Sequence, residues 1–148
     1  MLYTIGETAK KLGMAPSTLR YYDKEGLLPF AERSSGGMRV FKESDLEWLR
    51  TIACLKQTGM KLCDIKRFVD MAMQGDSTIG ERLKLIVRQK EEVKARISEL
   101  ESTLLTLEFK EWYYTEAKAA GTTEAPRSME LCELPERFRE VRLKLKGS

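Results

Sequence analysis

A regular apolar stripe in the second half of this 148-residue chain constrains its fold more than any other feature. Between residues 77 and 119, apolar side chains recur at alternating steps of four and three, which is the spacing of a coiled coil. The stripe consists of Ile79, Leu83, Ile86, Val93, Ile97, Leu100, Leu104 and Leu107, with Lys90 as its one polar member. No proline interrupts the segment, so the spacing predicts one long helix.

Such a helix has no surface of its own against which to bury the stripe. About 40 residues at roughly 1.5 Å each extend about 60 Å, much farther than a small lobe can cover. We therefore expect a second chain to cover the stripe, most simply another copy. The alternative is a helix that is covered by its own C-terminal segment. The residues expected at the dimer interface are Leu83, Ile86, Val93, Ile97, Leu100, Leu104 and Leu107.

The N-terminal residues have the pattern of two short helices followed by a hairpin. Thr4 and Glu7 form a capping box at the start of the first helix, and Gly13 ends it. Pro16 suits the first turn of a second helix, which Gly26 closes. The stretch RSSGGMRVF then predicts a two-stranded wing. Together these elements predict a winged helix-turn-helix.

Two further helices link this lobe to the long helix. Ser44 and Glu47 match a second capping box at the start of the first connector helix. Gly59 and Gly75 mark the ends of the two connector helices. The chain is therefore expected to be mainly α-helical and to have three regions. These are a DNA-binding domain with connector helices at 1–75, a coiled-coil dimerisation helix at 76–119, and a loop with a short helix at 120–148.

Composition limits the classes of function. The chain has no histidine and only three cysteines, without a CxxC spacing. This excludes Ser-His and Cys-His catalysis and fits reduced thiols, so we expect neither enzymatic activity nor a bound metal or cofactor. There is no signal-peptide pattern and no long apolar run, which favours a cytoplasmic protein without membrane contact. Residues 1–42 carry seven Lys and Arg against four Asp and Glu, which favours an anionic partner.

The stretch TIGETAKKLGMAPSTLRYYDKEGLL, with RSSGGMRVF and the long coiled-coil helix behind it, resembles the MerR family of bacterial transcription regulators. The resemblance covers roughly residues 2–117, and TLRYYDKEGLL is its most specific part. It implies an antiparallel coiled-coil homodimer on a palindromic promoter site. It also implies that the dimer distorts the promoter spacer on effector binding, which lets RNA polymerase initiate transcription.

Short hydroxyls and a guanidinium on the second helix can reach phosphates or base edges in a major groove. Adjacent tyrosines point in different directions on a helix, so one of the pair is expected in the core. Tyr22 either packs inward or meets the DNA backbone with its hydroxyl, and Arg20 taken alone could be an ordinary surface arginine. The expected DNA contacts are Ser17, Thr18, Arg20, Tyr21 and Tyr22 on the second helix, and Arg33, Gly37, Met38 and Arg39 in the wing.

Two positions depart from the family pattern. Ala15 stands where the family has a Ser or Thr that caps the recognition helix, a loss of about 1 kcal/mol. Phe41 replaces the usual tyrosine of the wing, which removes one hydroxyl that could meet a phosphate. We expect a looser start to the second helix and no loss of function.

The thiols are the candidates for effector sensing. About 30 residues after the long helix are too few for the large ligand domain of drug-binding family members, and the paired thiols of the metal-binding members are missing. WLRTIACLKQTGM resembles the aldehyde- and nitric-oxide-responsive subgroup, which makes Cys54 the candidate sensor. Arg50, four residues before it, favours a thiolate. Cys63, near a helix N-terminus, competes on physical grounds, and Cys54 could instead pack against a partner chain.

Two rival functions remain at this stage. One is an architectural winged-helix protein without an effector, which would need no fixed dimer span. The other is a coiled-coil adaptor whose first 75 residues bind protein partners.

Overall fold

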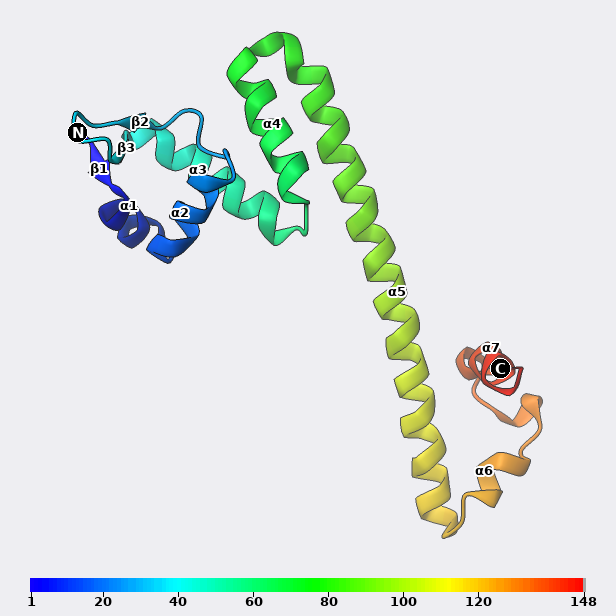
Figure 1. Ribbon diagram of the computed structural model, residues 1–148. Coiled ribbons are helices and arrows are strands. Elements are labelled where there is room, and N and C mark those ends of the chain that lie inside the picture. Colours follow the sequence, from blue (N-terminus) through cyan, green and yellow to red (C-terminus); the bar gives the residue numbers. More distant parts are fainter. Residues whose placement is uncertain (148) are drawn as a thin grey trace. The chain divides into compact units, whose positions relative to one another are not determined.

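The computed structural model describes residues 1–147 and is mainly helical, which confirms the expected fold class (Figure 1). It divides into two compact units, one of residues 1–91 and one that begins at Glu92. The N-terminal unit contains β1 (Tyr3–Thr4), α1 (Ile5–Leu12), α2 (Pro16–Lys24), β2 (Glu32–Arg33), β3 (Arg39–Phe41), α3 (Glu43–Gln57) and α4 (Leu62–Gln74). The long helix α5 (Ile79–Ala120) follows, and then α6 (Glu124–Ser128) and α7 (Glu136–Lys146).

The first helix begins at the capping box that the sequence predicts. The Thr4 backbone N–H donates to Glu7 Oε2 at 2.8 Å, and the Glu7 N–H donates to Thr4 Oγ1 at 3.3 Å. The bond from the Thr4 N–H, and a second from the Thr4 hydroxyl to Glu7 Oε2 at 2.9 Å, hold the pKa of Glu7 below its usual value. Gly13 ends α1 in the left-handed conformation, with φ of 64°. Ala15 caps α2 without a side-chain hydrogen bond, as expected.

The wing is part of a three-stranded antiparallel sheet in the order β1-β3-β2. Tyr3 pairs with Phe41, and Arg33 pairs with Arg39 across the predicted hairpin. The sequence did not predict β1, because a strand of two residues carries no alternating pattern. This strand joins the start of α1 to the base of the wing.

The start of α3 differs from the predicted capping box at Ser44 and Glu47. The helix begins at Glu43, and the carboxylate that caps it is that of Asp45. Asp45 Oδ2 accepts from the Lys42 backbone N–H at 2.8 Å. The prediction was wrong because an S-x-x-E match does not show which of two overlapping acidic residues reaches back to the helix end.

One core holds the N-terminal lobe and its connector together. Its fully buried side chains come from α2, the turn after it, β3, α3 and α4, which explains why these short elements form one body. They include Leu19, Leu27, Phe41, Leu49, Ile52, Ile65 and Val69.

The C-terminal segment does return to α5, but it covers a different stripe from the coiled-coil positions. Phe138 and Val141 on α7 pack with Phe109 on α5, and Leu105 and Trp112 lie beside them. Leu100 and its neighbours in the coiled-coil stripe remain exposed. The exposed fractions are 59% for Leu83, 39% for Ile86, 50% for Ile97, 67% for Leu100, 56% for Leu104 and 62% for Leu107. Val93 is half-buried.

Within residues 1–147, no helix is both long enough and apolar enough to cross a membrane.

Candidate nucleic-acid interface

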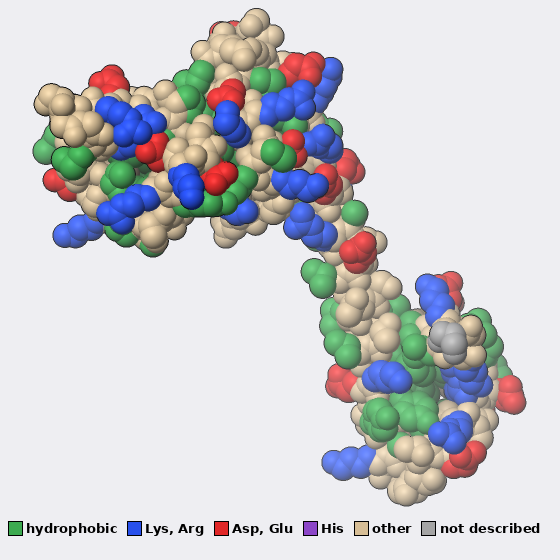
Figure 2. Space-filling view, in the orientation of Figure 1, with side chains coloured by type: hydrophobic (Ala, Val, Ile, Leu, Met, Phe, Trp, Pro, Cys, Tyr) green, Lys and Arg blue, Asp and Glu red, His purple; other side chains and the backbone are tan. Residues whose placement is uncertain are grey.

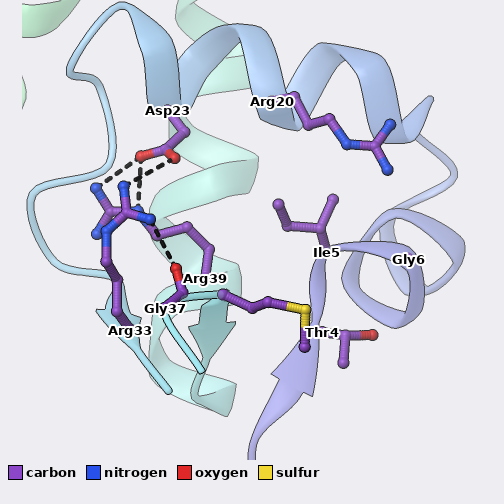
Figure 3. A pocket seen from close by; sticks show the side chains of 9 residues that line it. Thr4, Ile5, Gly6, Arg20, Asp23, Arg33, Gly37 and Arg39 are labelled. Atoms are coloured by element: carbon purple, nitrogen blue, oxygen red, sulfur yellow. Dashed lines mark hydrogen bonds and ion pairs between the residues drawn. The ribbon is translucent and has the colours of Figure 1, made fainter. Parts of the chain in front are cut away.

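A hollow in the surface of the N-terminal lobe lies between the start of α1, one side of α2 and the wing (Figure 3). Its volume is about 410 Å³. Three arginines and one carboxylate line it together with small residues and a methionine. The lining residues are Thr4, Ile5, Gly6, Arg20, Asp23, Arg33, Gly37, Met38 and Arg39. The fold therefore brings five of the residues predicted to bind DNA to one place. They are Arg20 on α2 and Arg33, Gly37, Met38 and Arg39 in the wing.

Helix α2 presents a polar, solvent-facing side next to this hollow. Ser17, Arg20 and Tyr21 are exposed, and Thr18 is half-buried. Leu19 between them is fully buried, so the helix is anchored through its opposite side. In Figure 3 Arg20 extends from α2 away from the Asp23 cluster and carries no drawn contact. Its guanidinium is thus placed to meet an anionic ligand.

The two tyrosines of α2 have separate positions. Tyr21 is 45% exposed, whereas Tyr22 is 5% exposed and belongs to the core of the lobe. Burial and the neighbouring Tyr21 raise the pKa of Tyr22 above its usual value. The ring of Tyr22 packs inward, as one of the two alternatives expected, and a contact of its hydroxyl with the DNA backbone stays a prediction.

Asp23 is the centre of the wing's attachment to α2. Arg39 Nε donates to Asp23 Oδ1 at 2.6 Å, and Arg39 Nη1 donates to the Ala31 carbonyl at 2.6 Å. Arg33 Nη2 lies 3.6 Å from Asp23 Oδ2, and its Nη1 donates to the Gly37 carbonyl at 2.8 Å. The guanidinium of Arg39 is thus engaged within the lobe, whereas Arg33 remains more than half exposed.

A tight turn shapes the tip of the wing. Gly37 has a φ of 79°, a conformation that favours glycine, and its N–H donates to the Ser34 carbonyl at 2.8 Å. Met38 beside it is 65% exposed. Figure 2 shows Lys and Arg side chains spread over the N-terminal unit with acidic side chains among them. The arrangement of charged side chains in the hollow therefore indicates a place for an anionic ligand better than the net charge of the lobe does.

The connector helices carry the two thiols that the sequence singled out. Cys54 on α3 and Cys63 in the first turn of α4 are both exposed, and so is Cys132. Arg50 is exposed one turn before Cys54 on α3. Neither connector thiol is buried as core filler within this chain. Across residues 1–147 there is no cluster of three or more Cys, Asp or Glu that could hold a metal ion.

The comparisons with known proteins match this arrangement. Residues 3–72 match the family described as MerR HTH family regulatory protein, and residues 46–108 match the one described as MerR, DNA binding. An HTH-type transcriptional regulator of Haemophilus influenzae is 47% identical over 136 residues, which cover 92% of this chain and 98% of that protein. The chain belongs to the MerR family. It is a DNA-binding transcriptional regulator of the MerR type, and not an enzyme, as expected.

Solved MerR structures share the fold. One is described as HiNmlR, a MerR family regulator lacking the sensor domain, bound to promoter DNA. It is 47% identical with a TM-score of 0.68, and the match covers 91% of this chain and 98% of that one. A MerR regulator from Bacillus thuringiensis is 46% identical with a TM-score of 0.64, covering 74% of this chain and 96% of that one.

The sequence did not assign four residues of this MerR lobe to the site. Asp23 organises the wing, and Thr4, Ile5 and Gly6 line the hollow. Asp23 carried a usable signal, since a lone carboxylate follows TLRYY in a helix that is otherwise basic or neutral. Thr4 was predicted only as a helix cap, and neither it nor Ile5 and Gly6 carried a signal for the site, because only the β1–β3 pairing brings them to the wing.

Proposed function

We propose that this protein binds a palindromic promoter site as an antiparallel coiled-coil homodimer, with α2 of each copy in a major groove. The observation that carries the proposal is the hollow that Arg20 of α2 and Arg33 of the wing both line. Two guanidiniums at the edges of one concave surface suit a bent phosphate backbone. HiNmlR, to which nearly all of this chain aligns, is described as bound to promoter DNA, which supports promoter DNA as the ligand.

The direct contacts divide into two groups. Ser17, Thr18, Arg20 and Tyr21 on α2 are exposed or half-buried and would reach phosphates and base edges. In the wing, Arg33, Gly37 and Met38 would contact the backbone or the minor groove. Arg39 contributes through Asp23 by holding the wing against α2, and Tyr22 contributes by packing beneath the helix.

The dimer would form through the coiled-coil stripe of α5. The C-terminal segment leaves these side chains exposed while it covers Leu105 and Phe109, so a second copy is the simplest cover. The antiparallel direction comes from the family resemblance. Two lobes related by a two-fold axis then require a palindromic site.

Regulation would act through the shape of the promoter. A dimer that bends and untwists the spacer brings the promoter elements into a register that RNA polymerase can use. The protein would therefore act on RNA polymerase indirectly, through DNA in the cytoplasm.

An effector signal would enter through a connector thiol, with Cys54 as first candidate and Cys63 as second. Both thiols are exposed on helices that join the DNA-binding lobe to α5. HiNmlR is described as lacking the sensor domain, and here the residues after α5 that the structure describes pack against α5 itself. A thiol in the connector offers a sensing site that needs no added domain.

Salt titration tests DNA binding against the adaptor alternative. A dimer with about six phosphate contacts should lose roughly a thousandfold in affinity between about 50 and 200 mM salt. Fluorescence anisotropy with duplexes that the protein selects from a random library would measure this loss. An adaptor predicts no selected duplex and no salt-dependent DNA affinity, and an architectural protein predicts binding without any response of transcription to an effector.

A further inference from the structure

The first turns of α5 contact both connector helices at the turn that joins them. Gln89 Nε2 on α5 donates to the Thr58 carbonyl, at the end of α3, at 3.1 Å. Arg88 Nη2, from the preceding residue, lies 2.9 Å from Asp64 Oδ2 in the first turn of α4. Two neighbouring side chains of α5 therefore bind the two sides of the α3–α4 turn. We call these two contacts the connector joint.

The bond from Gln89 is partly buried. Gln89 is 8% exposed, next to the buried Leu85 one turn earlier on α5, whereas Thr58 is exposed. Thr58 is the C-cap residue of α3, at the end of a helix where carbonyls take donors from outside the helix. Gln89 donates to it from another helix, which ties α5 to α3.

The far end of α4 is fixed to α5 as well. Thr78, just before α5, donates from Oγ1 to the Met71 carbonyl at 2.6 Å. Arg82 Nη2, one turn into α5, donates to the Gly75 carbonyl at 3.3 Å. Helix α4 is thus held to the start of α5 at both of its ends.

Helix α4 also reaches the end of the recognition helix. Gly26 follows α2 with a φ of 73°, and a Cβ built there would lie 3.0 Å from Lys66 Cε on α4. Lys66 sits two residues after Asp64, which pairs with Arg88. Helix α4 therefore meets α5 through Asp64, and it meets the turn that ends α2 through Lys66.

The same turns of α5 carry coiled-coil residues that face solvent. Leu83 is 59% exposed and Ile86 is 39% exposed. On the same turns Leu85 and Gln89 are buried, and Gln89 contacts the connector. One short piece of helix thus has a face for a second copy and a face for the connector. A change in the lobe's angle at the connector joint would change the distance between the two lobes of a dimer.

We propose that Gln89 is a positioning residue that, with Arg88, sets the angle of the DNA-binding lobe on the dimerisation helix and so sets the half-site spacing of the operator. This inference rests on the proposed function, because it requires a dimer on a palindrome. Gln89 touches no DNA in this role. It acts through the Thr58 carbonyl, and its loss leaves the surface of α2 and the wing unchanged.

The test uses the full chain and a palindromic duplex selected from a random library by the unaltered protein. Affinity is measured for that duplex, for versions with base pairs inserted or removed at the centre, and for an isolated half-site. Gln89→Ala should reduce the discrimination between spacings about three- to tenfold, which is the effect of one hydrogen bond, with half-site affinity unchanged. Arg88→Ala should also reduce the discrimination between spacings. Because Arg88 is exposed, its loss does not threaten folding.

Gln57→Ala provides the matched control, since Gln57 is an exposed glutamine at the end of α3. It should keep the spacing preference of the unaltered protein. If Gln89→Ala and Arg88→Ala dimerise and discriminate spacings as the unaltered protein does, the inference is wrong while the proposed function stands. If the unaltered protein selects no palindrome, the proposed function fails and the inference fails with it.

Discussion

Asp23 on α2 and Arg39 on β3 form an ion pair in which both Nε and Nη2 lie 2.6 Å from Asp23 Oδ1. The two side chains are only 19% and 20% exposed, so they are partly shielded from water. Because α2 is the proposed recognition helix and β3 is the base of the wing, this pair holds the two parts of the lobe that are proposed to face DNA in one arrangement. Arg33 shares the same carboxylate at a longer distance.

Asp23→Ala should therefore destabilise the lobe and weaken DNA binding together. Removing the carboxylate leaves Arg39 without its charged partner in a partly buried place, at a cost of about 1–2 kcal/mol. Chemical denaturation of the full chain would measure this cost. Asp70→Ala is the control, because its pair with Lys66 is more than 40% exposed on both sides and should contribute about 0.5 kcal/mol or less. Equal effects of the two substitutions would contradict the role given to Asp23.

Arg20→Ala should weaken promoter binding without changing stability or the oligomeric state. The side chain is exposed, so its loss removes no packing, and a direct guanidinium contact contributes about 1–3 kcal/mol for each lobe. Electrophoretic mobility shift with the selected duplex would measure the loss, with sedimentation as the check on assembly. Arg127→Ala, an arginine of α6 that is 68% exposed, is the matched control. If Arg20→Ala binds the duplex with unchanged affinity, the assignment of α2 as the recognition helix is wrong.

The sequence predicted those parts of the structure that local patterns encode. The Thr4–Glu7 capping box, the glycine ends of α1 and α2, and the apolar period of α5 all depend on residues within a few positions of each other. The Asp23–Arg39 pair spans sixteen residues and the Gln89–Thr58 bond spans thirty-one. Contacts of that kind follow from tertiary packing, which no short pattern specifies.

The apolar residues of α3 also follow a local period. Leu46, Leu49 and Ile52 are buried and Cys54 is exposed on another side of the helix. Leu55 is 9% exposed and belongs to the same core. The period of a single helix defines its inner face but not how much of it a neighbour covers.

Leu100→Lys should prevent the proposed dimer from forming and leave a monomer. The residue lies in the middle of the exposed stripe, and a charge there would be buried without a partner in a dimer interface. Sedimentation equilibrium over a range of protein concentrations would measure the change. Ser102→Lys adds the same charge two residues away, off the stripe, and should leave the dimer intact. A persistent dimer in Leu100→Lys would place the interface elsewhere, and the covered stripe around Phe109 would be the next candidate.

Cys54→Ser should abolish the transcriptional response to a small aldehyde or a nitric oxide donor while leaving promoter affinity within about twofold, since the thiol lies outside the α2–wing hollow. The readout is transcription in vitro from the bound promoter, with intact-mass measurement to identify the modified thiol. Cys132→Ser, an exposed thiol outside the connector, serves as the matched control and should respond fully. If the response is lost in Cys63→Ser and kept in Cys54→Ser, the sensing thiol is Cys63, in the first turn of α4. There the thiol adjoins Asp64, and a covalent adduct would act directly on the ion pair with Arg88.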